Sequence, residues 1–271
     1  MKQGTNIHPT AIVADTAKLG LSVTVGPYCV IEDHVRIGAG SSIASHCRIS
    51  GPTTIGDNNI IDSFAAIGGE PQDLSYKGEP TELIIGNNNH IREYASIHRG
   101  TVKGGGTTQI GDNCLFMAYS HVGHDCQIGD HVIIVNAAHL SGHTEVGDHA
   151  TVGGLTGTHQ FSRIGTFAFV GGGSAVGKDV PPYAMVTGER GQMRISGINK
   201  VGLRRNGYDK ETISKINSAY RILFHSGLLH NDALAKTEEE LGGCEAVDEL
   251  LRFIRASKRG VVKRTKKGSD S

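Results

Sequence analysis

The sequence contains no tryptophan, and aromatic residues make up only 5% of its 271 residues. It also lacks an excess of either charge, because 27 Lys and Arg residues balance 27 Asp and Glu residues. A balanced charge gives no general attraction to nucleic acid or to an anionic membrane, so we expect neither as a partner. No apolar run approaches the ~18 residues that a membrane-spanning helix needs, which argues against stable membrane insertion.

The beginning of the chain and its few cysteines both indicate a cytoplasmic protein. Residues 1–6 lead directly into a repeat that starts at Ile7, and this leaves no room for a signal peptide. Four of the five cysteines share one position of the repeat. We interpret them as small core residues and not as disulfides or metal ligands.

An aliphatic or aromatic residue recurs every six positions over most of the chain, from Ile7 to Ile67, from Ile85 to Ile97 and, with Thr158 as the one break, from Ile110 to Val176. Neither a helix nor an alternating strand has a period of six, whereas short strands wound into a solenoid do. The 38 glycines fit the many tight turns of such a fold. We expect three hexads to make one coil of 18 residues, with coils stacked about 4.8 Å apart.

The repeat lapses twice and then ends, which predicts the domain organisation. Loops are expected at 68–84 and 98–109, within a solenoid that spans residues 1–190. Residues 191–271 are expected to form a small α-helical domain with Asp209 as a helix N-cap. Its last residues, Lys258 to Ser271, form a basic tail that is either a frayed end or a contact for an acidic partner.

Seven of the fourteen histidines lie between residues 121 and 159. Steps of 18 residues predict which side chains become neighbours on successive coils. His124 should align with Gly142 and Gln160, and Asp125 should align with His143. Both His124 and Asp125 are expected to face outward near a turn, which predicts an exposed imidazole beside a carboxylate.

This arrangement suits acyl transfer by general-base catalysis. An imidazole with a pKa near ~6.5 can take a proton from a hydroxyl or amine nucleophile at neutral pH. Asp125 can orient the ring, and Gly142 allows a backbone N–H close to a developing oxyanion. The alternative is a polar strip on a non-catalytic scaffold.

A zinc site formed by His121, His124 and His143 is the competing chemical interpretation, because three imidazoles suit a catalytic zinc. The repeat places His143 beside Asp125 instead of beside another histidine, so no metal is predicted.

Several motifs occur together in a fixed order along the chain. The chain resembles the UDP-N-acetylglucosamine O-acyltransferases that begin lipid A synthesis in Gram-negative bacteria, and the likeness covers essentially its whole length. The motifs are Gly69–Pro80 with Gln72-Asp73-Leu74, Ile97-His98-Arg99-Gly100-Thr101, His121–Cys126, Leu140-Ser141-Gly142-His143, His159-Gln160-Phe161 and Asp179–Tyr183.

The resemblance implies a homotrimer of left-handed parallel β-helices with active sites between subunits. It implies transfer of an (R)-3-hydroxyacyl group from the phosphopantetheine of acyl carrier protein to the 3-position of a UDP-sugar, with no bound cofactor. By the same resemblance His124 is the general base, Asp125 its partner and Gly142 the oxyanion donor. Gly172 would limit acyl length, and a glycine there favours a longer chain. The implied substrate-binding residues are Gln72, Asp73, Ser75, His121, His143, His159, Gln160, Asn199, Arg204 and Arg205.

Two positions depart from the pattern of the resembled family. Many members have lysine where this chain has Ser75, and many have glutamate where it has Val201. The acceptor region thus loses one cation and one anion, so the 3-amino analogue of the sugar is kept as an alternative acceptor. The acidic carrier protein is expected to dock on Arg204, Arg205 or the basic tail.

Overall fold

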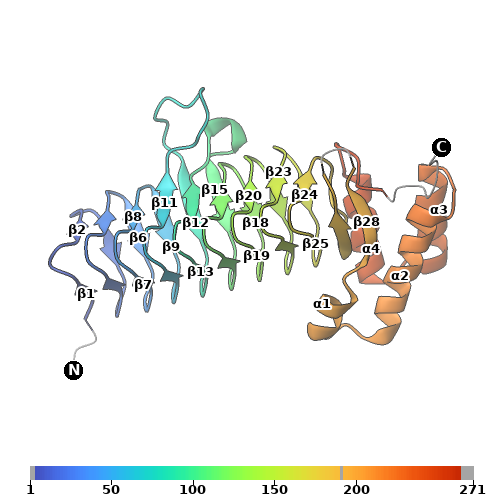
Figure 1. The fold of residues 1–271 in the computed structure, drawn as a ribbon, viewed down its shortest axis with the longest axis horizontal. Coiled ribbons are helices and arrows are strands. Elements are labelled where there is room, and N and C mark those ends of the chain that lie inside the picture. Colours follow the sequence, from blue (N-terminus) through green and yellow to red (C-terminus); the bar gives the residue numbers. More distant parts are fainter. Residues whose placement is uncertain (1–3, 190–191, 264–271) are drawn as a thin grey trace.

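The computed structural model describes residues 4–189 and 192–263, and it is an elongated solenoid followed by four helices (Figure 1). The strands of the solenoid fall into three parallel sheets, one for each side of the coil. Together with the hexapeptide repeat and the similarity to solved structures given below, this confirms the predicted left-handed β-helix with a small helical domain. No described helix is long and apolar enough to cross a membrane.

The first sheet has eleven strands, the second nine and the third eight. The first contains β1 (Asn6–Ile7), β4 (Thr24–Val25), β7 (Ser42–Ile43), β10 (Ile60–Ile61), β13 (His90–Ile91), β16 (Leu115–Phe116), β19 (Ile133–Ile134), β22 (Thr151–Val152), β25 (Phe169–Val170), β27 (Ala184–Thr187) and β28 (Arg194–Ile198). The second contains β2 (Ile12–Val13), β5 (Val30–Ile31), β8 (Arg48–Ile49), β11 (Ala66–Gly69), β14 (Ser96–His98), β17 (His121–Val122), β20 (His139–Leu140), β23 (Gly157–Thr158) and β26 (Ala175–Val176). The third contains β3 (Lys18–Leu19), β6 (Val35–Ile37), β9 (Thr53–Ile55), β12 (Glu82–Ile85), β15 (Thr107–Ile110), β18 (Gln127–Ile128), β21 (Glu145–Val146) and β24 (Arg163–Ile164).

Paired strands show the coil length directly. Asn6 pairs with Thr24 and Gln127 pairs with Glu145, which are offsets of 18 residues. The offset rises to 30 where Ile60 pairs with His90, and to 25 where Ser96 pairs with His121. The extra residues leave the stack as two adjacent excursions without disturbing the coils on either side.

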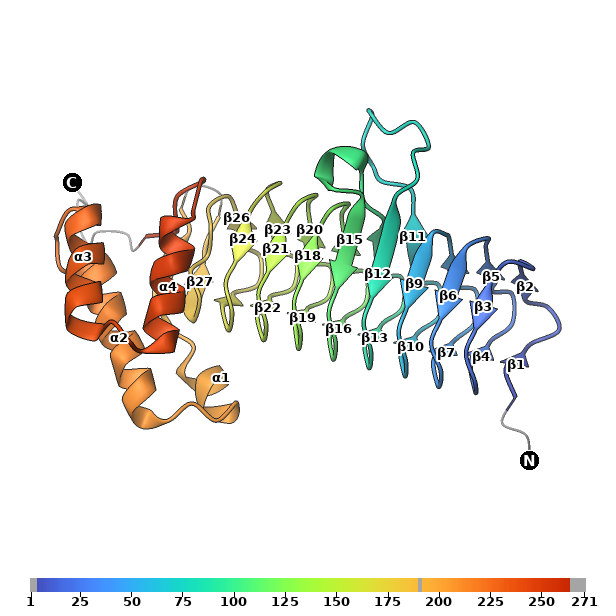
Figure 2. The same cartoon turned by 180° about the vertical axis from the view of Figure 1, so that it is seen from behind.

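The two excursions are residues 70–81 and residues 99–106, which include the 3₁₀ turn η1 (Val102–Gly104). They lie side by side on one edge of the solenoid in both ribbon views (Figures 1 and 2). The strands reach into both stretches predicted as loops, because β11, β12 and β15 have four residues each and pair over this extra length.

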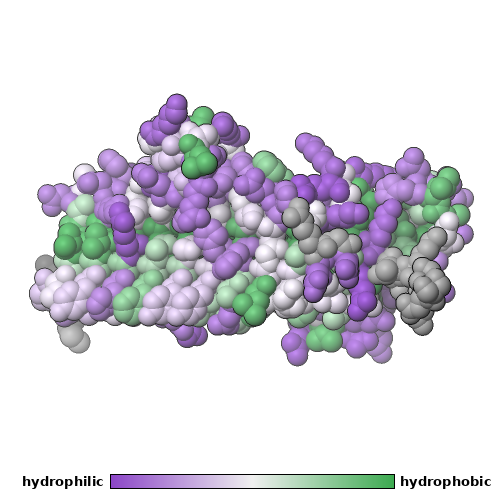
Figure 3. Space-filling model, turned by 45° about the horizontal axis from the view of Figure 1, so that its top comes forward, coloured by the Kyte–Doolittle hydropathy of each residue, from purple (hydrophilic) through white to green (hydrophobic). Residues whose placement is uncertain are grey.

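The core is built by the repeat positions expected from the sequence. The aliphatic anchor and the residue four positions later both point inward, as Val25 with Cys29 and Val122 with Cys126 illustrate. The five cysteines are free, and four of them are buried. In Figure 3, hydrophobic residues reach the surface along the solenoid, whereas the excursions and the helices present mostly hydrophilic ones.

The C-terminal part closes one end of the solenoid. Strand β28 pairs antiparallel with β27, so the first sheet continues beyond the predicted domain boundary at 190/191, which lies outside the described residues. The helices are α1 (Lys200–Arg205), α2 (Lys210–His225), α3 (His230–Leu241) and α4 (Glu245–Arg255). Asp209 caps α2 as predicted. Most of the predicted basic tail, residues 264–271, also lies outside the described residues.

Candidate active site

His124 and Asp125 lie at the corner between β17 and β18, where the chain passes from the second sheet to the third. Asp125 adopts a left-handed backbone with φ of 61°, a conformation that Asp tolerates better than most residues. Gly123 runs close to the next coil, where an added Cβ would lie 2.8 Å from the backbone nitrogen of Gly142. The corner therefore projects His124 and Asp125 out of the core while Cys126 returns into it.

The two side chains are buried, so the prediction of an exposed imidazole is wrong. His124 is 6% exposed and Asp125 is 4% exposed. The second excursion covers them, because the backbone N–H and the hydroxyl of Thr101 each donate to a different Asp125 oxygen at 2.7 Å. Gly104 lies directly against the same carboxylate, where any Cβ would collide with it. The site is thus shielded from bulk water by residues that lie outside the repeat.

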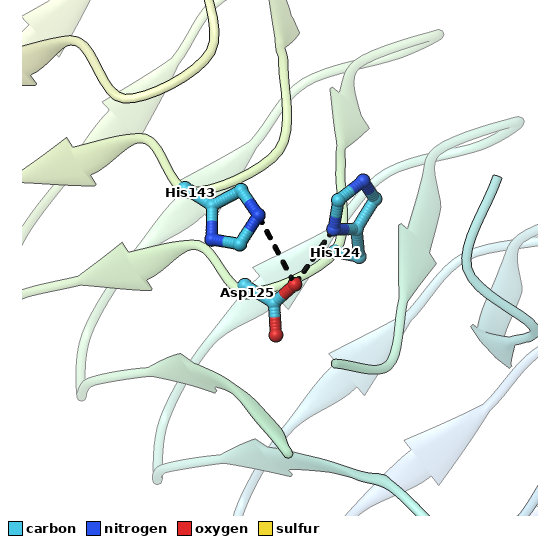
Figure 4. Close-up of side chains that lie close together, drawn as sticks. All are labelled: His124, Asp125 and His143. Atoms are coloured by element: carbon cyan, nitrogen blue, oxygen red, sulfur yellow. Dashed lines mark hydrogen bonds and ion pairs between the residues drawn. The ribbon is translucent and has the colours of Figure 1, made fainter. Parts of the chain in front are cut away.

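The histidine and the carboxylate form a direct hydrogen bond. Nδ1 of His124 donates to Oδ2 of Asp125 at 2.7 Å (Figure 4). An N–H at Nδ1 leaves the lone pair on Nε2, which is the tautomer that a general base requires. Nε2 faces the next coil, where a Cβ added to Gly142 would lie 2.6 Å away. Only glycine therefore leaves this space open beside the base.

His143 shares the same carboxylate from the coil above. Its Nε2 lies 3.6 Å from Oδ2 of Asp125, and its ring stacks on Phe161 with centroids 4.2 Å apart (Figure 4). Burial lowers the pKa of His143, and the nearby Asp125 charge partly opposes this effect. The pairing of residues 125 and 143 is the one that the 18-residue step predicted.

Three further histidines form a row along the second sheet beside this corner. His121 pairs with His139 as the step predicted, and its Nδ1 is hydrogen-bonded to Ser96 Oγ at 2.8 Å. The ring of His98 contacts that of His121 edge-on, with centroids 5.0 Å apart. Sequence reasoning missed His98, although it stands in a quoted motif directly after a core anchor. Burial, followed by the neighbouring histidines, lowers the pKa of His121 to about 4.

This shift predicts how stability depends on pH. Between pH ~6.5 and 4 the unfolded chain binds a proton at His121 that the folded chain excludes. Stability from this group is therefore complete above pH ~6.5 and is lost as the pH falls toward 4. We expect the melting temperature to decrease across this window, and to decrease less in His121→Gln. Equal pH dependence of the two proteins would contradict the burial of a neutral His121.

The first excursion brings Gln72, Asp73 and Ser75 to the same edge. Asp73 Oδ1 accepts from the Ser75 backbone N–H at 2.8 Å, and Lys103 Nζ donates to Ser75 Oγ at 3.0 Å. The hydrogen bonds from Ser75 lower the pKa of Asp73, and the charges of Lys103 and His124 add to this. Lys103 was missed because it lies in the glycine-rich lapse of the repeat, where no period assigns neighbours.

The remaining predicted residues divide into two groups. His159 and Gln160 are exposed at the corner one coil above Gly142, where the Phe161 N–H donates to the Gly142 carbonyl at 3.3 Å. The second group lies apart from His124 within one chain. Gly172 stands at the corner between the first and second sheets, Asn199 caps α1, and Arg204 and Arg205 end that helix.

His124, Asp125 and His143 also have ligand atoms within 4.8 Å of one another, so they are a geometric candidate for a metal ion. This set differs from the zinc set considered from the sequence, since Asp125 replaces His121. An ion that used Nδ1 of His124 or the Asp125 oxygens would replace the hydrogen bonds that these atoms already make. The donor set therefore fits a hydrogen-bonded pair better than a metal centre.

Comparison with known proteins gives the same answer along the whole chain. The chain is 57% identical over 259 residues to the acyl-[acyl-carrier-protein]–UDP-N-acetylglucosamine O-acyltransferase of Trichlorobacter lovleyi, covering 95% of this chain and 99% of that one. The protein of the same name from Myxococcus xanthus is 48% identical, with the same coverage of both chains. The chain belongs to the UDP-N-acetylglucosamine O-acyltransferase family. The family model described as domain 2 matches residues 179–262, and the bacterial transferase hexapeptide model matches residues 16–51 and 107–142.

Solved structures of the UDP-N-acetylglucosamine O-acyltransferase family share this fold. The enzyme from Moraxella catarrhalis is 43% identical and superposes with a TM-score of 0.91, covering 95% of this chain and 99% of that one. The enzyme from Francisella novicida is 39% identical with a TM-score of 0.91, covering 96% and 95%. The similarity extends from the first coils to the C-terminal helices.

Proposed function

We propose that this protein transfers an (R)-3-hydroxyacyl chain from acyl carrier protein to the 3-position of a UDP-N-acetylglucosamine-type sugar, the first step of lipid A synthesis. Membership of the acyltransferase family supports the reaction class. The observation that supports the mechanism is the buried His124–Asp125 pair, whose unprotonated Nε2 faces Gly142.

In this mechanism Nε2 of His124 takes the proton of the sugar 3-hydroxyl while its oxygen attacks the thioester carbonyl. Asp125 holds the ring in place and stabilises the imidazolium that forms. The Gly142 N–H donates to the oxyanion of the tetrahedral intermediate. When the intermediate collapses, the carbon–sulfur bond breaks and the imidazolium returns its proton to the phosphopantetheine sulfur. The products are the ester and the free thiol of the carrier protein, and no cofactor takes part.

The surrounding residues would bind the two substrates. Asp73 with Gln72 and Ser75, together with His121, His143, His159 and Gln160, are assigned to the sugar and acyl cleft. A neutral His121 and a His143 of lowered pKa can accept or donate hydrogen bonds without adding positive charge. Asn199, Arg204 and Arg205 are assigned to the nucleotide and to the carrier protein.

The proposal includes a homotrimer, in which the second group of residues from one chain would meet the His124 corner of another. A stack of aromatic rings on the outside of the solenoid supports a subunit contact. The rings of Tyr28, His46, Phe64, Tyr94 and Tyr119 follow one another with centroids 4.8–5.1 Å apart. Four of these side chains are large and at least 45% exposed in the single chain, an arrangement typical of surfaces that pair with another subunit.

The 3-amino analogue of the sugar is the second candidate acceptor, because Ser75 and Val201 depart from the common pattern of the acceptor region. We expect the 3-hydroxyl sugar to be the preferred substrate and mass spectrometry to show an ester product. The measurement is kcat/KM with the two nucleotide sugars side by side, using mixed acyl donors to find the preferred chain length. Faster turnover of the 3-amino sugar would reverse the acceptor assignment. Loss of activity on treatment with a chelator, restored by zinc, would revive the metal-dependent mechanism.

A further inference from the structure

Arg99 ties the two excursions together beside the buried His124–Asp125 pair. Its side chain is 8% exposed and donates to the carbonyl oxygens of Gly68 and Gly51 at 2.9 and 3.3 Å. It also donates to the Tyr76 hydroxyl at 3.1 Å. A buried guanidinium with several acceptors fixes the segments that supply them. The first excursion is therefore held in a defined position relative to the second.

The segment that carries Lys103 is fixed independently by Asp125. Thr101 gives both its N–H and its hydroxyl to the Asp125 carboxylate, and its Oγ1 then accepts from the Gly104 N–H to close the turn. Gly104 packs against the same carboxylate. Lys103 thus lies between two residues that both touch the partner of the proposed general base.

The ammonium of Lys103 reaches across to the first excursion. Nζ donates to Ser75 Oγ at 3.0 Å, and Ser75 N–H donates to Asp73 Oδ1 at 2.8 Å. The charge of Lys103 also contributes to the lowered pKa of Asp73, after the larger contribution of the Ser75 hydrogen bonds. An ammonium has three N–H donors, so its bond to Ser75 leaves two for other acceptors.

We propose that Lys103 is a substrate-positioning residue that donates to a hydroxyl of the acceptor sugar while Asp73 accepts from it. A neighbouring cation and anion suit a hydroxyl, which both accepts and donates, better than they suit a phosphate, which Asp73 would repel. Lys103 would then supply, from the other excursion, the positive charge that position 75 lacks in this chain. This inference rests on the proposed function, since it assigns the same acceptor site.

The test is the kinetics of Lys103→Gln with the nucleotide sugar as the varied substrate. We expect KM for the sugar to rise roughly 10–100-fold, as is usual when a hydrogen bond from a charged group is lost. Turnover at saturation and KM for the acyl donor should stay within about threefold, because Lys103 does not touch the reacting atoms. The double variant Ser75→Lys with Lys103→Gln should restore most of the affinity by moving the cation to the other excursion.

The matched control is Lys77→Gln, which removes an exposed cation from the first excursion. It should leave both KM values unchanged. A wild-type KM in Lys103→Gln would overturn the inference. So would a fall in melting temperature and turnover that Ser75→Lys does not rescue, since Lys103 would then only clamp the two excursions.

Direct binding separates this inference from the proposed reaction. Calorimetry measures Kd of UDP-N-acetylglucosamine for the wild type and for Lys103→Gln without any acyl transfer. If the wild type binds the sugar but transfers no acyl group, the reaction fails while a raised Kd in the variant still supports Lys103. If the wild type neither binds nor acylates it, both the reaction and the role of Lys103 are overturned.

Discussion

Replacing His124 by alanine should lower kcat by about 10²–10⁴-fold or more, with a melting temperature close to that of the wild type. The variant removes the group that takes the nucleophile's proton but leaves the coil backbone and the core residues Val122 and Cys126 in place. Steady-state turnover of the carrier-bound acyl donor measures the effect, and thermal unfolding measures the fold. A protein that acts only as a trimeric scaffold would lose nothing in this assay.

His131→Asn is the matched control for this substitution. His131 lies at the next corner of the same chain, where it is exposed and stacks on His149 with centroids 4.6 Å apart. Its φ of 57° is a conformation that asparagine also adopts. We expect near wild-type turnover for this control. Near wild-type turnover in His124→Ala itself would end the general-base assignment.

Asp125→Asn should reduce kcat by on the order of 10²–10⁴-fold, although the side chain keeps its size and its backbone conformation. The carboxylate uses one oxygen for the Thr101 N–H and the other for both His124 Nδ1 and the Thr101 hydroxyl. An amide oxygen facing the Thr101 N–H puts an NH₂ group against His124 Nδ1. The ring must then carry its proton on Nε2, where it is the wrong tautomer for a base.

The same variant should also loosen the second excursion, since one donor of the covering segment loses its acceptor. Limited proteolysis near Gly104–Gly106 measures this loosening, and kcat measures the tautomer effect. Asp130→Asn is the control, because its Oδ1 accepts only a backbone N–H from Asp112 at 2.7 Å among its printed contacts, and an amide oxygen can do the same. Full activity of Asp125→Asn would show that the carboxylate does not orient the ring.

The parts of the site that follow the repeat were predictable from the sequence. His124 meets Gly142, and Asp125 meets His143, because parallel pairing fixes an offset of 18 residues and side chains follow the backbone. The same regularity assigned Cys29 and Cys126 to the core. The family resemblance, confirmed by the relatives, carried the fold beyond what spacing alone gives, including its handedness.

The parts that failed lie where the repeat lapses. Thr101 and Gly104 bury the His124–Asp125 pair, but they belong to a glycine-rich segment whose path no periodicity predicts. Lys103 and Arg99 were missed for the same reason, since their contacts depend on how two irregular segments meet. A prediction of exposure from the repeat position alone considers the coil and ignores what is laid over it.

The column formed by His124, Gly142 and Gln160 occupies successive coils, so its spacing is the rise of the stack, about 4.8 Å per coil. Main-chain hydrogen bonds common to every coil set this distance, and no particular side chain has to be tuned for it. In a solenoid each coil contacts only its neighbours. Complete coils gained or lost toward the N-terminus would therefore translate the site along the axis without changing its geometry, which leaves the length of the protein and its chemistry free to evolve separately.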